Sequence, residues 1–109
     1  MKKNEQNYLD RVPKKNEGIN WTKEDVVTLE IENKGIMNRL FQKFFKKPKI
    51  SYVHLDGMGS FIWKEIDGEK TVTEIGEKVS AHFGDDANPL YERLIKYLEI
   101  LKSYNFIEY

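Results

Sequence analysis

The segment Val53 to Ile75 reads V-H-L-D-G-M-G-S-F-I-W-K-E-I-D-G-E-K-T-V-T-E-I and joins a predicted sheet to a predicted helical unit. Its first part is the end of a strand. A helix is expected over about Met58 to Ile66, and Asp67 and Gly68 should end it, because glycine readily adopts the left-handed conformation that closes a helix. The segment therefore predicts a strand, a tight junction and a helix, in that order.

Two more helices are predicted after that turn. Thr71 with Glu74 three positions later matches the capping box, in which each side chain binds the other residue's main-chain N–H, and the helix should run to about position 83. Asn88 is expected to cap the third helix, with Pro89 at its first position and the end near Tyr104. The last residues, 106–109, should form a closing strand or a tail.

Strands are predicted upstream of the segment. Residues 25–33 alternate apolar and polar side chains, the period-two pattern of a half-buried strand, and its partner is expected around 19–22. Residues 50–55 form the next strand. A small antiparallel sheet of about three strands followed by three α-helices predicts an α+β fold resembling a winged helix-turn-helix.

The chain is expected to hold one domain. Residues 1–18 are rich in Lys, Asn and Glu and predict a flexible N-terminal arm, whereas residues 19–109 form the domain. An additional basic helix is expected at about 36–47, because its apolar residues have helical spacing and Pro48 stops it.

Composition excludes several classes of function. The 109 residues are 39% hydrophobic and 33% charged, and none of the apolar stretches is long enough to span a membrane. Lys plus Arg and Asp plus Glu both number 18, so the broad positive charge of nucleic-acid-binding proteins is missing. No cysteine is present, which excludes disulfides and thiolate chemistry. A cytoplasmic protein that does not bind nucleic acid is expected.

Catalytic and metal sites are not predicted. His54 and His82 lie far apart on different elements, without a second ligand at metal-binding spacing. The acidic residues between positions 56 and 69 are explained as a helix cap and turn residues, and Gly57-Met58-Gly59 lacks the third glycine of a phosphate loop. We expect no catalytic residue, no metal and no cofactor.

The segment quoted above resembles the PqqD family. The residues that carry the resemblance are Leu55, Asp56, Gly59, Ile62, Trp63, Asp67, Gly68, Thr71, Val72, Glu74 and Ile75, with Phe106 and Ile107 near the end. The resemblance implies a non-catalytic domain that binds the leader of a ribosomally made precursor peptide for a modifying enzyme, often a radical SAM protein. The basic helix at 36–47 departs from the family pattern, so we do not assign the chain to pyrroloquinoline quinone synthesis.

The resemblance also implies where the peptide lies. Such peptides add as a strand beside the third strand and pack on the third helix, which points here to Tyr52, Val53 and His54. On the third helix, one apolar stripe of residues 90, 94, 97, 101 and 104 is widened on one flank by Tyr91, Ile95 and Leu98. This flank is expected to contact the peptide. The alternative is that the basic helix or a second subunit covers it.

Other interpretations stay open. The basic side of the 36–47 helix, with Lys43, Lys46 and Lys47, is expected to dock an acidic partner protein, or else simply faces solvent. A winged-helix DNA-binding regulator and a structural or oligomerising module, including a homodimer, are the competing functions. The third helix carries as basic residues only Arg93, Lys96 and Lys102, which argues against duplex binding.

Overall fold

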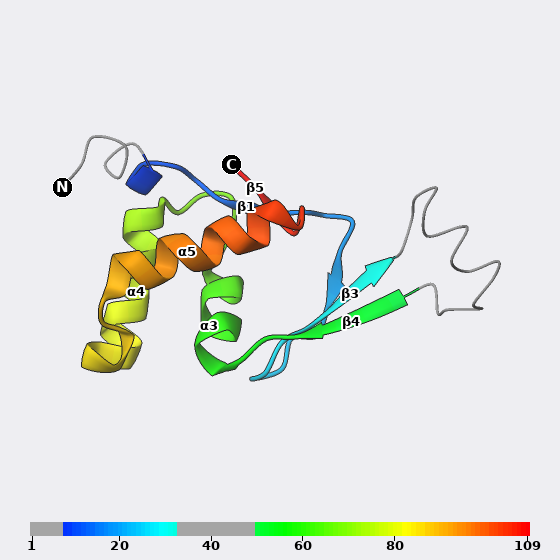
Figure 1. Ribbon diagram of the computed structural model, residues 1–109, viewed down its shortest axis with the longest axis horizontal. Helices are drawn as coiled ribbons and strands as arrows, with labels where there is room; N and C mark the ends of the chain where they lie inside the picture. The colour runs from blue at the N-terminus through cyan, green and yellow to red at the C-terminus, as the bar shows by residue number, and fades with distance from the viewer. Residues whose placement is uncertain (1–7, 33–49) are drawn as a thin grey trace.

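A three-stranded antiparallel sheet precedes the three α-helices in the computed structural model, which describes residues 8–32 and 50–109. Its strands are β2 (Asn20–Trp21), β3 (Thr28–Glu32) and β4 (Ile50–His54), in the order β2-β3-β4. Three α-helices follow along the chain, so the predicted α+β class and element order are confirmed. Figure 1 shows the β3–β4 pair extending away from the helices.

The period-two pattern explains which face of the sheet is buried. Leu29 is fully buried and pairs with half-buried Val53, whereas Glu30 pairs with Tyr52, whose side chain is 59% exposed. Trp21 lies on the buried face and meets the Trp63 ring edge to face at 6.2 Å between centroids. One face of the sheet therefore contributes to the core and the other faces solvent.

Helix α3 (Gly57–Glu65) starts directly after β4 because Asp56 caps it, its carboxylate accepting from the Gly59 main-chain N–H at 2.6 Å. The buried Ser60 hydroxyl ties this helix to the sheet by accepting from the Val27 main-chain N–H at 2.8 Å. The turn after α3 contains Gly68 at φ 78°, the left-handed conformation that the sequence predicted.

Helix α4 (Val72–Phe83) begins with the predicted capping box. The Thr71 hydroxyl accepts from the Glu74 main-chain N–H, and the Glu74 carboxylate accepts from the Thr71 main-chain N–H. Gly84 follows, as expected, and starts a short 3-10 helix, η1 (Gly84–Ala87), that the sequence did not predict.

Helix α5 (Leu90–Ser103) starts one residue later than predicted. Pro89 occupies the cap position and Leu90 is the first helical residue, so the prediction of Asn88 as N-cap is wrong. The Asn88 amide group instead donates to the Asp85 carboxylate at 3.4 Å, and its main-chain N–H donates to the Asp85 carbonyl. Because Asn88 bonds to Asp85 of η1, its side chain does not cap α5.

A second, two-stranded sheet joins the two ends of the described chain. Strand β1 (Lys14–Lys15) pairs antiparallel with β5 (Ile107–Glu108), which shows that the last residues form the closing strand rather than a tail. Leu9 and Pro13, both in the predicted arm, are buried. The Thr73 hydroxyl on α4 donates to the Leu9 carbonyl at 3.1 Å, so residues before β1 lie against the helices.

One apolar core connects both sheets and the helices. Trp63 and Ile66 are fully buried within it. From α5, the core takes Leu94, Leu98 and Leu101, whereas Tyr104 at the end of the predicted central stripe is 65% exposed. No helix in the described part of the chain is long and apolar enough to cross a membrane. The expected basic helix at 36–47 lies outside the described residues.

Candidate functional site

In the part of the chain that the structure describes, β4 is an edge strand of the three-stranded sheet and has no partner strand on its outer side. In an antiparallel pair, alternate residues turn both main-chain polar groups toward the partner strand and the residues between turn them away. Leu55 donates to the Val27 carbonyl at 2.9 Å, so Val53 also bonds toward β3, whereas Tyr52 and His54 direct their N–H and C=O outward. Within residues 8–32 and 50–109, these outward N–H and C=O groups have no hydrogen-bond partner.

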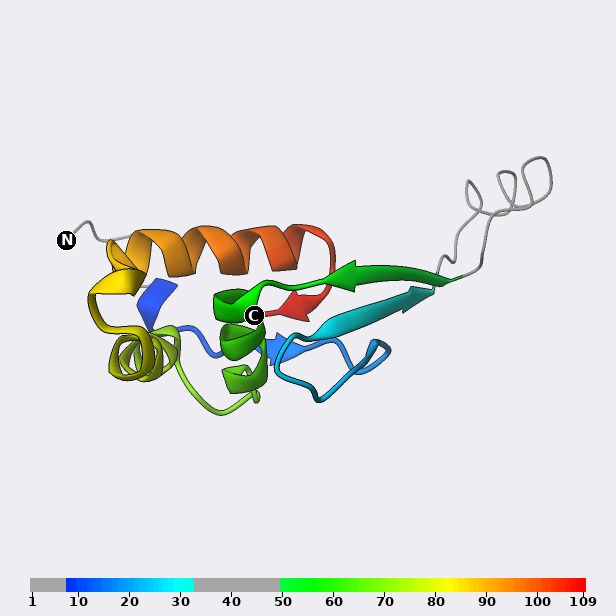
Figure 2. The ribbon, with the colours of Figure 1, turned by 90° about the horizontal axis from the view of Figure 1, so that it is seen from below.

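A cavity of about 280 Å³ lies between α3 and α5 and is also lined by Val79 of α4 and Ala87 of η1. Its floor is apolar and includes Met58 and Ile62 from α3 together with Leu94 from α5. Asp56, which follows the last residue of β4 by two positions, also lines it. Figure 2 shows α5 passing over the junction between β4 and α3. The connection between β4 and α3 therefore contributes Asp56 to the cavity.

Tyr97 closes the cavity against α3. Its hydroxyl donates to the Gly59 carbonyl at 3.1 Å, and a Cβ at position 59 would lie only 2.8 Å from the Tyr97 hydroxyl oxygen. Glycine is thus required there by close approach, not by backbone conformation. Burial, with a smaller contribution from the Asp56 carboxylate, raises the pKa of the Tyr97 hydroxyl well above its ordinary value, so the ring stays neutral.

Two cations lie at the outer rim of the cavity. Arg93 and Lys96 belong to α5, line the cavity and are exposed. The Arg93 guanidinium donates to the main-chain carbonyl of Asp86 at 2.8 Å, which fixes it at the rim without neutralising it. The ion pairs found among the described residues are Lys14–Glu17 and Lys70–Asp67, so neither rim cation is paired with a carboxylate of this part of the chain.

The strand residues predicted to bind peptide occupy the edge of the sheet. Tyr52 and His54 are exposed and supply the outward main-chain groups, while half-buried Val53 bonds toward β3. The His54 imidazole Nδ1 lies 2.9 Å from the Thr28 hydroxyl across the strands, so its side chain is engaged with the sheet.

The helix residues predicted to bind peptide lie on a different flank of α5 from the cavity. Tyr91 packs over Gly76 of α4, and its hydroxyl donates to the Thr73 carbonyl at 3.3 Å. Ile95 is half buried against the core. Leu98 is fully buried, so its side chain belongs to the core and offers no surface to a peptide. Neither the basic helix nor a second subunit is needed to explain the burial of Tyr91 and Leu98. Lys43, Lys46 and Lys47 lie outside the described residues.

Sequence reasoning missed the cavity side of α5. Arg93, Lys96 and Ile100 recur at helical spacing on one face, and Ile100 is 46% exposed. An exposed isoleucine one turn from two cations was the available signal. The apolar arc of the helix does not include this face, because two of its three residues are cations.

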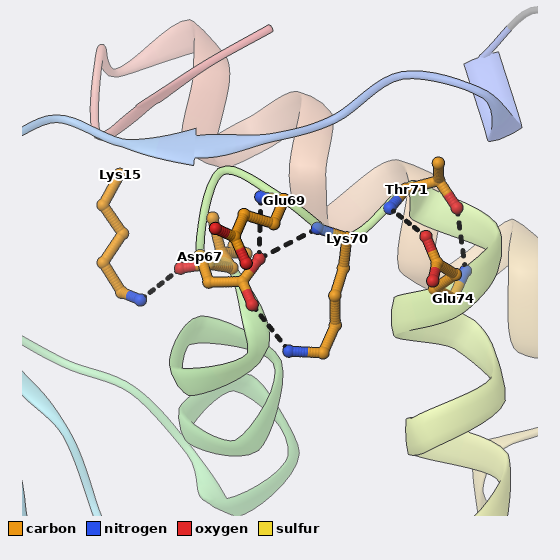
Figure 3. A network of polar contacts seen from close by, with 7 residues as sticks. Lys15, Asp67, Glu69, Lys70, Thr71 and Glu74 are labelled. Atoms are coloured by element: carbon orange, nitrogen blue, oxygen red, sulfur yellow. Dashed lines mark hydrogen bonds and ion pairs between the residues drawn. The ribbon is translucent and has the colours of Figure 1, made fainter.

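A polar network elsewhere on the molecule has a structural role. Figure 3 shows Asp67 at its centre, where the carboxylate accepts from the main-chain N–H groups of Glu69 and Lys70 and from the Lys70 ammonium group. These hydrogen bonds hold the pKa of the Asp67 carboxyl well below its usual range. The ammonium group of Lys15 donates to the Ile66 carbonyl beside this turn. The network orders the α3–α4 turn.

The described residues contain no group of three or more His, Asp or Glu side chains that could hold a metal ion. The site therefore consists of a strand edge, an apolar cavity and two rim cations, which is an arrangement suited to binding an extended chain.

A family model, described as coenzyme PQQ synthesis protein D, matches residues 26–107. The match spans β3, β4 and all three α-helices, and hence every element of the site. The chain belongs to the PqqD family. Proteins of the PqqD family are non-catalytic peptide-binding chaperones. Neither the curated proteins nor the solved structures gave a match.

Proposed function

We propose that this PqqD-family protein binds the leader segment of a ribosomally synthesised precursor peptide and presents it to a modifying enzyme. The leader adds as a fourth strand on β4 and places apolar side chains in the cavity against α5. Family membership supports the class of ligand and of partner. The sequence resemblance adds that the modifying enzymes served by such domains are often radical SAM proteins.

The free edge of β4 is the observation that carries this proposal. Tyr52 and His54 offer two N–H donors and two C=O acceptors in register, and a peptide strand that pairs with them satisfies all four groups. Main-chain pairing of this kind gives affinity with little dependence on sequence, whereas side-chain pockets give specificity.

The cavity supplies that specificity. Its lining residue Asp56 follows the last residue of β4 by two positions, so in this proposal a strand paired with His54 continues toward Met58 and Ile100. A volume of about 280 Å³ accommodates one or two large apolar side chains and lies near the lower end of the usual range for ligand pockets. Burial of one leucine-sized side chain contributes about 2 kcal/mol to binding.

Selection of peptides from a random library tests the proposal. The full chain is immobilised, and the library peptides are long enough to add one strand of typical length. We expect enriched peptides to bind in solution and to protect the amides of Tyr52 and His54 from hydrogen exchange. The amide of Val53, already bonded to β3, serves as the internal reference. Peptides that bind without protecting these two amides would contradict strand addition.

A further inference from the structure

The rim of the cavity carries an unbalanced positive charge, although the whole chain has a formal net charge of zero. Arg93 and Lys96 are its cations, and Asp56 is the carboxylate among the cavity-lining residues. The balance at the rim depends on how far each of these charges is already neutralised.

The negative charge of the Asp56 carboxylate is largely compensated by contacts within the fold. Its carboxylate accepts from the Gly59 N–H at 2.6 Å and lies at the positive N-terminal end of α3. Within residues 8–32 and 50–109, the hydrogen-bond partner found for the Arg93 guanidinium is a neutral carbonyl, and neither Arg93 nor Lys96 has an ion-pair partner. Two cations without an ion-pair partner in the described part of the chain therefore line the same apolar cavity as Asp56, whose carboxylate already caps α3.

We propose, resting on the peptide-binding function above, that the bound segment is acidic: an apolar side chain enters the cavity and a neighbouring Asp or Glu pairs with Arg93 and Lys96. The two cations are three positions apart on α5, so they are neighbours on one face of the helix. A carboxylate next to the apolar anchor can reach both. Charge-assisted hydrogen bonds to a guanidinium are stronger than neutral ones, and the guanidinium is already oriented by Asp86.

The arrangement selects against basic peptides. A Lys or Arg in the same place would meet two like charges beside an apolar surface that raises their cost. Selectivity for the acidic leader therefore comes from Arg93 and Lys96, while affinity shared by all extended peptides comes from the β4 edge.

Parallel selections test this inference. The random library is applied to the natural chain, to the double variant Arg93→Glu/Lys96→Glu, and to the matched control Lys64→Glu/Lys78→Glu. The control reverses two exposed lysines that do not line the cavity and changes the net charge equally. We expect an excess of Asp and Glu beside an apolar residue in the pools from the natural chain and the control, and an excess of Lys and Arg from the double variant.

Affinities of one enriched acidic peptide give a second measure. Replacing its acidic residue with the corresponding amide should weaken binding to the natural chain about tenfold and leave binding to the double variant nearly unchanged. Raising the salt concentration should weaken only the acidic form, a test that needs no variant. Asp56→Asn keeps a good capping residue and should strengthen binding of the acidic peptide about threefold.

The two proposals fail in different ways. Enriched peptides that bind at β4 but show no acidic excess would overturn the charge selectivity and leave the peptide-binding function intact. Failure to enrich any peptide would overturn the peptide-binding function and the charge selectivity with it.

Discussion

The two sheets of this protein treat their edges differently. The β1–β5 sheet has only two residues in each strand, and aromatic and cationic side chains from the chain ends surround it. The Tyr8 and Tyr109 hydroxyls are hydrogen bonded to each other, the Arg11 guanidinium lies 5.5 Å from the Tyr109 ring centroid, and the Lys102 ammonium lies 4.3 Å from it. In the β2-β3-β4 sheet, by contrast, the longer strand β4 has no partner on its outer edge among the described residues.

This difference separates stability from binding. The β1–β5 sheet pairs residues that are far apart in sequence and places Ile107 in the core. Its role is therefore to stabilise the domain. An unpaired strand edge is normally a liability, because it can pair with any other chain. Its retention beside an apolar cavity is explained if a peptide strand is its partner.

The largest effect on stability is expected at the closed sheet, which is the sheet formed by β1 and β5. Ile107→Ala removes a core side chain that is 3% exposed and should lower the free energy of unfolding by about 2–5 kcal/mol. Val12→Ala, at a position that is 38% exposed, should change it by less than about 0.5 kcal/mol. Denaturant titration gives both values. Peptide affinity of the folded Ile107→Ala protein should match that of the natural chain; a large loss of affinity would show that the two regions are coupled.

The next effect separates the two flanks of α5. Ile100→Asp places a charge at the cavity on a residue that is 46% exposed and should weaken peptide binding more than tenfold with little loss of stability. Ile95→Asp lies on the flank that the sequence favoured, where Tyr91 already packs on α4. Isothermal titration with an enriched peptide compares them. Loss of binding in Ile95→Asp alone would return the site to the flank that the sequence predicted.

The sequence predicted elements whose signals are local. The capping box at Thr71 and the alternation around Leu29 each act within a few residues, and both elements formed as expected. Strand β1 carries no such signal: Lys14 and Lys15 become a strand only because Ile107 and Glu108 lie beside them. The cap of α5 was mispredicted because Asp85 competes for Asn88.

Part of the candidate site was also predictable, because two of its elements have local sequence signals. The strand Ile50–His54 and the helix after Pro89 were found from local patterns, and the family resemblance placed the peptide between them. Which side of α5 remains open depends on how α4 and the residues around Leu9 pack, and such long-range packing leaves no periodic trace in the sequence.

A smaller effect is expected at the open edge itself. Tyr52→Pro removes an N–H that points away from β3, so it should leave stability largely intact and weaken peptide binding about fivefold. Val53→Pro is the matched control: it removes an N–H that bonds to β3 and should cost about 1–3 kcal/mol of stability. Tyr52→Ala separates loss of the side chain from loss of the N–H. Equal destabilisation by both proline variants would contradict the assigned register.

The smallest effect concerns alkaline pH and links the two regions. Burial raises the pKa of the hydroxyls of Tyr97 at the cavity and of Tyr8 at the closed sheet. In the unfolded chain a tyrosine ionises near pH 10, so above that pH the folded state holds more protons than the unfolded state. The free energy of unfolding should therefore fall as the pH rises above about 10, and stay flat with respect to these groups below it.

Phenylalanine variants show how much of this loss of stability at alkaline pH comes from each region. Tyr97→Phe and Tyr8→Phe should each reduce the slope of unfolding free energy against pH above about 10, because each removes one group whose proton uptake differs between the two states. Ultraviolet titration of the folded protein with an enriched peptide then distinguishes them. A peptide in the cavity excludes water from Tyr97 and should delay its ionisation further, while Tyr8, beside Tyr109 at the closed sheet, should titrate as before. A peptide that shifts Tyr8 and not Tyr97 would place the binding site at the closed sheet instead of the open one.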